Sequence, residues 1–296
     1  MTKQIGIIGT GVVGTAVGVI LNRRGYEIAG VYDVNSESTA QLADETGCRV
    51  FTDPSQLSCS AEILFITVND SAIGQIAAVL ADSGAFRNGQ IVIHMSGAHS
   101  AEILAPAREF KAQVLSVHPL QSFASLMGAI ESLPGSVFSI QGDEAAYETA
   151  IELVEALGGE YFFIPEEGKP LYHAGACVVS NYLVTLIDLG ARLLEASGIP
   201  AGQSSRALMP LVRGTLGNIE RVGIPAALTG PIARGDVATV AKHLECMRDL
   251  AGDMVELYRV LGFYTAPIAR SKGTIDEARM AEFRDLLGPN ANGDEE

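Results

Sequence analysis

IGIIGTGVVG, at residues 5–14, is the stretch of this 296-residue sequence that decides its fold. Residues 5–8 predict a short buried strand, and a GxGxxG turn follows it directly. A helical pattern then runs to about Arg24, and a second apolar run occupies residues 28–33. Strand, turn, helix and strand in this order, within about thirty residues, indicate a βαβ unit. The segment therefore predicts the start of an α/β domain.

The glycine spacing in this turn predicts a dinucleotide-binding site. Gly9 permits a tight turn, Gly11 lets the backbone approach a pyrophosphate, and Gly14 lets the helix pack closely on the strand. The helix N-terminus adds N–H donors and positive potential. A glycine-rich turn without a ligand is the alternative. We expect the cofactor to contact the whole turn, Gly9-Thr10-Gly11-Val12-Val13-Gly14.

Asp33, which ends the second strand, bears on the choice between NAD and NADP. A carboxylate there accepts hydrogen bonds from the adenosine ribose hydroxyls and repels a 2′-phosphate, which favours NAD. Alternatively, Asp33 only caps the helix that starts near Ser36, or Asn35 and Ser36 hold a phosphate with basic help from elsewhere.

Apolar runs alternate with helical patterns as far as residue 164, which is typical of a doubly wound parallel sheet covered on both faces. The predicted strands are residues 4–8, 28–33, 63–68, 90–95, 114–117, 137–140 and 161–164. After Pro165 only helices are predicted, at 169–197, 203–222, 236–261 and 275–287. We therefore predict a Rossmann-type dinucleotide-binding domain at 1–165, an all-α substrate and dimerisation domain at 166–289, and a disordered tail at 290–296.

Charge and composition exclude several classes of partner. A net charge of −15 repels phosphate backbones and anionic lipid head groups, so we expect neither nucleic acid nor a membrane as a partner. No stretch reads as a membrane span or a cleaved signal peptide. The four cysteines form no CxxC pair, which suits a reducing compartment. We expect a cytoplasmic protein that acts on a small anionic molecule.

A strongly apolar helix predicted around residues 172–194 carries one polar stripe. His173, Cys177 and Asn181 follow at steps of four, which places them on one face. Such a stripe faces a cavity or ligand, or else it bonds to a neighbouring helix. We expect His173 to act as general acid while hydride arrives, and Asn181 to hold the substrate's carbonyl or carboxylate. Cys177 is expected to line the site without acting as a nucleophile.

Further candidates lie at or just after the carboxyl ends of predicted strands, at the sheet edge where open α/β folds bind ligands. Val68 and Ser96 are expected to contact the cofactor, and His118 is expected to be catalytic beside the nicotinamide. His94 is a weaker candidate of the same kind. Either histidine is alternatively a loop side chain satisfied by protein hydrogen bonds. Because the histidines show no HxxxH or carboxylate spacing, no metal site is predicted.

A turn in the second half, Thr229-Gly230-Pro231, precedes a helix that Asp236 is expected to cap. Thr229 and Gly230 offer backbone donors to a bound anion, and Arg234 can clamp a carboxylate. We expect these three residues to bind the substrate, unless the segment serves only as a turn and helix cap.

The helix at 172–194 resembles that of ketopantoate reductases, in which a catalytic lysine is followed by asparagines after four and eight residues. The resemblance puts His173 in the place of the lysine, Cys177 in that of the first asparagine, and Asn181 on the second. The chain also resembles the 6-phosphogluconate dehydrogenase-like superfamily over nearly its whole length. Segments 118–123 and 228–236 resemble a group of uncharacterised two-domain Rossmann-like proteins. The superfamily resemblance implies an interdomain cleft for nicotinamide and substrate, and a homodimer.

These observations predict an NAD(P)H-dependent oxidoreductase that transfers hydride to a small 2-oxo acid, with a ketopantoate-like substrate as the first choice. Two alternatives stay open. One is reduction of a cyclic imine, as in pyrroline-5-carboxylate reductase, whose fold is similar. The other is a non-catalytic protein that binds NAD(P) as a sensor.

Overall fold

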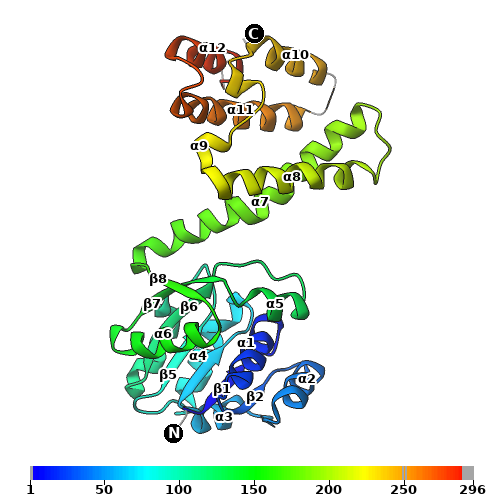
Figure 1. Ribbon diagram of the computed structural model, residues 1–296. Helices are drawn as coiled ribbons and strands as arrows, with labels where there is room; N and C mark the ends of the chain where they lie inside the picture. The colour runs from blue at the N-terminus through cyan, green and yellow to red at the C-terminus, as the bar shows by residue number, and fades with distance from the viewer. Residues whose placement is uncertain (1–2, 249, 251, 289–296) are drawn as a thin grey trace. The chain divides into compact units, whose positions relative to one another are not determined.

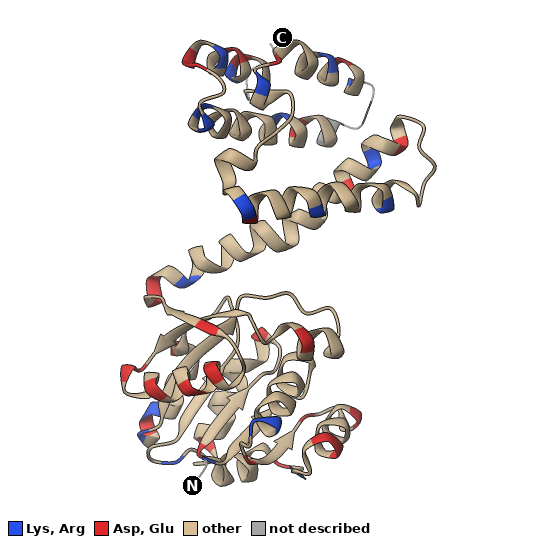
Figure 2. Cartoon of the chain, in the orientation of Figure 1, with Lys and Arg blue, Asp and Glu red and all other residues tan. Residues whose placement is uncertain are grey.

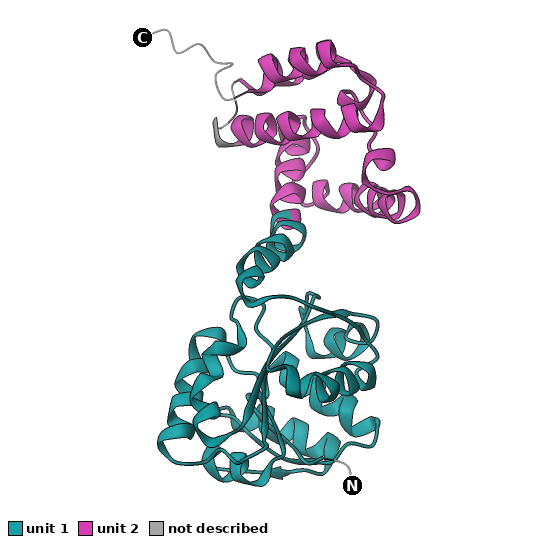
Figure 3. Cartoon of the chain, turned by 90° about the vertical axis from the view of Figure 1, so that its left-hand side faces the viewer, with its two compact units in different colours: residues 1–182 teal, residues 183–296 magenta. Residues whose placement is uncertain are grey.

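The computed structural model describes residues 3–248, 250 and 252–288, so the predicted tail at 290–296 lies outside the described residues. Its two compact units, Met1–Tyr182 and Leu183–Glu296, have different colours in Figure 3. The division falls inside helix α7 (Lys169–Ala196), whereas the sequence analysis placed the domain boundary before this helix. Side chains of the first turn of α7 bond to the sheet, which is why this part of the helix groups with the first unit.

The first unit is built on one eight-stranded sheet (Figure 1). The strand order is β3-β2-β1-β4-β5-β6-β7-β8, and β1 pairs in parallel with both β2 and β4. The order reverses between β1 and β4, so their carboxyl ends form the switch point of a doubly wound sheet. The predicted α/β class is confirmed. The strands are β1 (Ile5–Ile8), β2 (Ile28–Tyr32), β3 (Arg49–Val50), β4 (Ile63–Ile66), β5 (Ile91–His94), β6 (Gln113–Pro119), β7 (Val137–Gly142) and β8 (Glu160–Phe163).

Helices cover both faces of the sheet, because neighbouring strand residues point into two different cores. Ile7 of β1 packs into a core with α1 (Val12–Arg23) and α6 (Tyr147–Ala156). Ile8 packs into a second core with α4 (Asp70–Asp82). Full burial of such a side chain contributes about 1.5–3 kcal/mol. The other helices of this unit are α2 (Ser36–Thr46), α3 (Pro54–Ser60), α5 (Leu126–Ser132) and the 3₁₀ segments Ala101–Phe110, Glu144–Ala146 and Glu166–Gly168.

The last two strands run opposite to the other six, so the predicted parallel sheet is confirmed for β1 to β6 and wrong for β7 and β8. β7 pairs antiparallel with β6, and β8 pairs in parallel with β7. The segment between β6 and β7 returns to the edge where β6 ends, as shown by the bond from the Leu120 N–H to the Val137 carbonyl (2.8 Å). Apolar patterning predicts strands, but their direction depends on this connection. The two-residue strand β3 was not predicted because it is too short to show a pattern.

The second unit is all-helical in its described residues, as predicted. The single helix predicted at 236–261 is wrong, because the chain forms α10 and α11 there, and α11 continues through Pro267. Packing overrides propensity at this point: Ala266 of α11 is fully buried in a core with Phe283 of α12. After α7, the helices are α8 (Ser204–Val222), α9 (Ile224–Ala227), the 3₁₀ segment Ile232–Arg234, α10 (Val237–Met247), α11 (Gly252–Lys272) and α12 (Glu277–Leu287).

Helix α7 is strongly apolar although little of it is buried. Residues Glu166–Ala196 are long and apolar enough to cross a membrane, with a mean hydropathy of 1.4 in the most apolar window, and only 11% of that window is buried. The long uncharged stretch of α7 is tan in Figure 2. The prediction that no stretch reads as a membrane span therefore does not hold for length and composition, because polar residues such as Asn181 and Asp188 do not lower the mean hydropathy of this helix enough. One such helix is weak evidence for membrane insertion, since core helices of soluble proteins meet the same criterion.

Candidate functional site

The turn between β1 and α1 needs its glycines for steric reasons. Gly9 has a φ of +97°, and a Cβ there would lie 2.6 Å from the backbone nitrogen of Val68. A Cβ on Gly14 would overlap the Gly9 carbonyl oxygen, so only glycine lets α1 pack this closely. Gly11 faces open space and caps α1 without a side-chain hydrogen bond. The backbone N–H groups at this helix end are therefore accessible to an anionic ligand.

Asp33 closes the same turn from the end of β2. Its Oδ2 accepts hydrogen bonds from the Thr10 N–H (2.6 Å) and hydroxyl (3.3 Å), and its Oδ1 accepts from the Asn35 N–H (2.9 Å). Asn35 caps α2 by accepting from the Glu37 N–H (3.0 Å), so the alternative role of Asp33 as the helix cap is wrong. The carboxylate is held beside the glycine turn, where dinucleotide-binding folds place the ribose.

A pocket of about 120 Å³ lies at the switch point of the sheet. The structure thereby brings together Val13, Val68 and Ser96, three predicted cofactor contacts from separate segments. The Ser96 hydroxyl also accepts from the Ala98 N–H (3.2 Å) and the His99 N–H (3.3 Å), so it shapes the loop after β5. A pocket lined by both apolar and polar side chains beside a glycine turn fits a nicotinamide dinucleotide. The lining residues are Val13, Ile66, Thr67, Val68, Asp70, Ile73, Met95 and Ser96.

Two histidines and a tyrosine meet at the same edge of the sheet. His118, near the end of β6, and Tyr172, on α7, share a hydrogen bond between Nδ1 and the hydroxyl (2.7 Å). The rings of His118 and His173 are 6.5 Å apart, centroid to centroid. Gly97 packs against both: a Cβ there would lie 2.7 Å from His173 Nδ1 and 2.8 Å from His118 Nε2. These two nitrogens are therefore at most 5.5 Å apart, the sum of the two distances.

The two imidazoles differ in their partners. Among the described residues, His173 Nδ1 is buried without a hydrogen-bond partner, and His173 Nε2 lies 3.6 Å from Cys177 Sγ. His118 Nδ1 has the Tyr172 hydroxyl, whereas no described residue hydrogen-bonds to His118 Nε2. Each ring thus turns one uncommitted nitrogen towards Gly97.

Lys169, the first residue of α7, is a buried cation next to this group. It is 1% exposed, and its Nζ donates to Ser116 Oγ (2.7 Å) and lies 5.5 Å from the centre of the Tyr172 ring. Burial lowers the pKa of Lys169 to about 8, although the negative charge of Asp70 opposes this. Burial, and then the positive charge of Lys169, lowers the pKa of His118 to about 3. At neutral pH the site therefore holds a charged lysine and an uncharged His118.

His94 has the structural role that the sequence analysis left open. It is fully buried at the end of β5. Its Nδ1 accepts from the Ser96 N–H (3.1 Å), and its Nε2 lies 3.1 Å from the Ser100 carbonyl oxygen. Burial is the main cause that lowers its pKa to about 3. Because both nitrogens serve the loop after β5, His94 has none left for a substrate.

Comparison with protein families divides the sequence into two parts. Residues 2–119 match the Rossmann-like domain, and residues 136–265 match a domain of unknown function, DUF2520. The chain joins a Rossmann-like domain to a DUF2520 domain. The DUF2520 match includes β7 and β8, so it contains the two strands that run opposite to the rest. No functionally curated sequence matches the chain.

Solved structures of similar fold cover almost the whole chain. A protein from Thermotoga maritima is 26% identical with a TM-score of 0.73, and the match covers 91% of this chain and 99% of that one. A reductive aminase from Aspergillus terreus, in complex with NADPH and ethyl-5-oxohexanoate, is 13% identical (TM-score 0.60; 98% and 94% covered). A pyrroline-5-carboxylate reductase from Coxiella burnetii is 17% identical (TM-score 0.60; 93% and 100% covered). The predicted two-part fold is confirmed, and the specific resemblance to ketopantoate reductase stays a prediction.

The remaining predicted residues lie farther along the chain. Asn181 is exposed on α7, two turns after His173. Thr229 and Arg234 are exposed, and Gly230 has a φ of +91°; all three belong to the second compact unit. The prediction that Asp236 caps a helix is confirmed, because its Oδ1 accepts from the Thr239 N–H (3.0 Å) at the start of α10.

Three residues of this group were not predicted from the sequence: Lys169, Tyr172 and Ser116. A signal for Lys169 was present, since it lies four residues before His173 and extends the polar stripe of α7 by one turn. Tyr172 is next to His173 in the sequence but was taken as part of the apolar pattern. Ser116 lies inside a buried strand, and only its bond to Lys169 distinguishes it from a packing residue.

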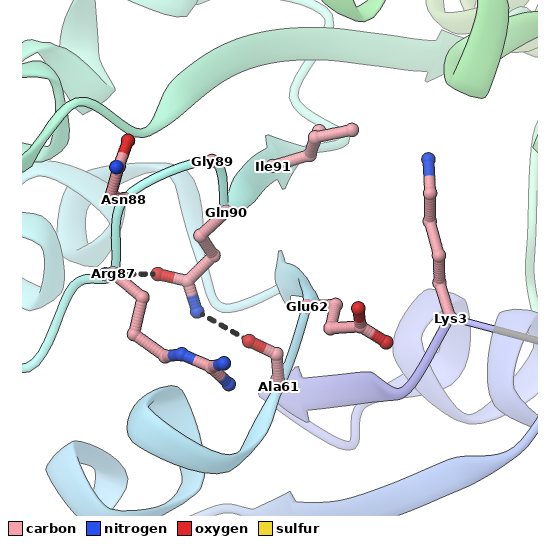
Figure 4. A pocket seen from close by; sticks show the side chains of 8 residues that line it. All are labelled: Lys3, Ala61, Glu62, Arg87, Asn88, Gly89, Gln90 and Ile91. Atoms are coloured by element: carbon pink, nitrogen blue, oxygen red, sulfur yellow. Dashed lines mark hydrogen bonds between the residues drawn. The ribbon is translucent and has the colours of Figure 1, made fainter.

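A second pocket, of about 110 Å³, lies at the opposite end of the strands (Figure 4). It is lined by Lys3 before β1, Glu62 before β4 and the turn before β5, where Gln90 donates to the Ala61 carbonyl (2.9 Å). None of the predicted site residues lines it. The pocket at the switch point is therefore the candidate site.

Proposed function

We propose that this protein is an NAD(P)H-dependent reductase that adds hydride to the carbon of a small C=O or C=N group. The observation that supports the proposal is that two features of the Rossmann-like unit are formed by consecutive residues. Ser96 lines the pocket at the switch point, and the next residue, Gly97, packs against the rings of His118 and His173. A dinucleotide pocket and a group of proton donors thus meet at one loop, as reduction of a polar double bond requires.

The bound cofactor would supply the hydride, and this chain's residues would bind the substrate and supply the proton. The two imidazoles are the proposed proton donors, with His173 as predicted general acid and His118 beside it. Asn181 would hold the substrate's carbonyl or carboxylate group, and Cys177 would form part of the wall. The Gly9–Gly14 turn and the N-terminus of α1 would hold the pyrophosphate.

We propose a small 2-oxo acid of the ketopantoate type as the first substrate candidate. An uncharged imidazole N–H, such as that of His118, can polarise a carbonyl without being an acid at neutral pH. A cyclic imine is the second candidate, which is supported by the similarity to a reductive aminase and a pyrroline-5-carboxylate reductase. Thr229, Gly230 and Arg234 are the proposed contacts of an anionic substrate in the DUF2520 domain.

We propose NADH as the preferred cofactor, because Asp33 places a carboxylate beside the turn where a 2′-phosphate would be repelled. The similar reductive aminase was solved with NADPH, so the preference has to be measured against both cofactors. The four cysteines are free, which fits a proposed cytoplasmic location.

We also propose that the protein is a homodimer. Support comes from the exposed apolar side chains of the second unit, among them Val184 of α7 (69% exposed) and Leu211 of α8 (67% exposed). Exposed apolar surface of this kind is typical of an interface. A second copy of the chain is the proposed partner.

The proposed function is tested by titrating the purified protein with NADH and NADPH and following the intrinsic fluorescence of the reduced nicotinamide. Oxidation is then followed by absorbance with ketopantoate, with pyrroline-5-carboxylate, and with a ketone plus an amine. Saturable binding and turnover of one substrate class are expected. Binding without oxidation of any substrate would support the sensor alternative, and absence of binding to both cofactors would overturn the proposal.

A further inference from the structure

The hydrogen bond between His118 and Tyr172 determines which nitrogen of His118 is available to a substrate. A neutral imidazole has one N–H donor and one acceptor nitrogen. If the Tyr172 hydroxyl donates to Nδ1 across the 2.7 Å bond, the proton of His118 sits on Nε2. Nε2 is the nitrogen that approaches Gly97, next to the residue that lines the cofactor pocket. With the Tyr172 hydroxyl as the donor, His118 turns its Nε2–H towards the site.

Lys169 is placed to influence this pair by its charge rather than by contact with a substrate. Its side chain is 1% exposed, and Ser116 supplies its one hydrogen bond among the described side chains. No carboxylate of the described residues lies within 4.0 Å of its Nζ, whereas the Tyr172 ring centre is 5.5 Å away. A buried cation stabilises nearby negative charge and disfavours nearby positive charge.

We propose that Tyr172 and Lys169 are positioning residues for His118, whose Nε2–H donates to the substrate atom that gains negative charge when hydride is added. This inference rests on the proposed reductase function and names the proton path within it. It favours His118 over His173 as the donor. Among the described residues, the His173 ring has Cys177 Sγ as its one hydrogen-bond partner, and it has no hydroxyl from which to recover a proton.

For a carbonyl substrate, the proposed proton path runs from Tyr172 through His118 to the substrate oxygen. The bound nicotinamide would supply the hydride, so one of its C–H bonds would break as the substrate's new C–H bond forms, and the electron pair of the C=O π bond moves to oxygen. Oxygen takes the proton from His118 Nε2, while Nδ1 takes the Tyr172 hydroxyl proton. The resulting phenolate belongs to a ring whose centre lies 5.5 Å from Lys169 Nζ, and it recovers a proton from water after the product leaves. The net change is addition of one hydride and one proton to the substrate.

The charged and titratable groups around His118 come from three elements. Lys169, Tyr172 and His173 face it from the start of α7, and His94 lies at the end of the adjacent strand β5. Asp70, at the start of α4, acts on Lys169. Lys169 is the group among these that changes charge near pH 8, so it should set the alkaline limit of turnover.

The first test compares Tyr172→Phe with Tyr161→Phe, which removes an exposed hydroxyl of β8 as a matched control. We expect kcat of Tyr172→Phe to fall about a hundredfold with KM within about twofold, and Tyr161→Phe to stay near wild type. The same variants are examined by ¹⁵N NMR of the His118 ring, assigned with His118→Gln, which requires no turnover. The population with the proton on Nε2 is expected to fall in Tyr172→Phe only.

The second test uses the charge of Lys169. Wild-type kcat is expected to decline above about pH 8, as the lysine loses its proton. Lys169→Arg should extend the activity to higher pH because guanidinium stays charged. Lys169→Met should lower kcat and abolish the decline of kcat above about pH 8. The NMR titration midpoint of His118 should rise in Lys169→Met.

Two NMR results together would overturn this inference even if no substrate is found. They are an unchanged His118 tautomer in Tyr172→Phe and an unchanged His118 titration midpoint in Lys169→Met. A larger loss of kcat in His173→Gln than in His118→Gln would also overturn it, because His173 would then be the donor. Failure of the wild-type protein to bind either cofactor would instead count against the proposed function alone.

Discussion

Lys169 is a charged residue held where water cannot hydrate it. Its pKa of about 8 in the folded protein lies below the ordinary value of 10.5, because burial disfavours the ammonium form. The unfolded chain therefore binds more protons between these two values, and stability rises with pH across that window. Below pH 8 the charged side chain costs roughly 3 kcal/mol, since each pKa unit corresponds to about 1.36 kcal/mol.

Lys169→Met should therefore be more stable than the wild type at pH 7. The gain in free energy of unfolding is expected to reach up to about 3 kcal/mol and to shrink as pH rises from 8 to 10.5. Urea unfolding at several pH values measures it. A variant less stable than the wild type at pH 7 would show that the lysine stabilises the fold. A gain would indicate that the residue is kept for function.

Gly97→Ala is expected to disturb the site without unfolding the protein. The new Cβ would lie 2.7 Å from His173 Nδ1 and 2.8 Å from His118 Nε2, so one or both rings must shift. We expect kcat to fall at least about tenfold, with the Kd for NADH within about twofold of wild type. Gly175→Ala is the control, because a Cβ there meets open space on α7. Equal activity of the two variants would show that the close contact of Gly97 with the two histidine rings is not needed for the reaction.

Asp33→Ser tests the choice of cofactor. Loss of the carboxylate removes both the repulsion of a 2′-phosphate and the bond to the Thr10 N–H. We expect the ratio of NADPH to NADH affinity to rise about tenfold, or roughly 1.4 kcal/mol, in fluorescence titrations. Glu37→Gln, an exposed carboxylate of the same segment, should leave the ratio unchanged. A ratio unaffected by Asp33→Ser would show that another group selects the cofactor.

At the level of elements, the sequence of α7 predicts which of its residues share a face, but it does not predict which other segments that face contacts. Its period placed His173, Cys177 and Asn181 on one face, and the contact between His173 and Cys177 agrees with this. The period did not show that Lys169 would be buried against Ser116, because that contact joins residues 53 positions apart. Long-range contacts of this kind leave no trace in a local pattern.

The cap of α10 gives a prediction about an element. Asp236 accepts from both the Thr239 N–H (3.0 Å) and the Thr239 hydroxyl (2.6 Å), so it satisfies one of the free donors of the first turn. Asp236→Ala should lower the midpoint of thermal unfolding. Asp236→Asn should keep the midpoint close to that of the wild type, because the amide oxygen can still accept the hydrogen bond. Asp285→Ala, an exposed position of α12, serves as control. Equal midpoints for all three variants would mean that this cap does not limit the stability of the protein.

At the level of the whole molecule, the exposed apolar side chains of α7 and α8 need an explanation. We expect light scattering to give a mass twice the 31.1 kDa of one chain, because a second copy would cover this surface. Leu211→Glu should shift the protein towards monomer, whereas Val79→Glu, at an exposed apolar position of α4, should not. A monomeric wild type that floats with lipid vesicles would instead favour a membrane role for α7.

The sequence by itself determined the dinucleotide turn, the α/β and all-α halves, and the stripe on α7. These features depend on local rules: glycine sterics in a turn, apolar runs in strands, and a helical period of 3.6 residues. Tertiary structure decided the rest. It reversed β7 and β8, committed His94 to its own loop, held Asp33 against Thr10, and brought Lys169 and Tyr172 to His118. Each of these depends on which distant segments become neighbours, and a pattern within one segment carries no information about its neighbours.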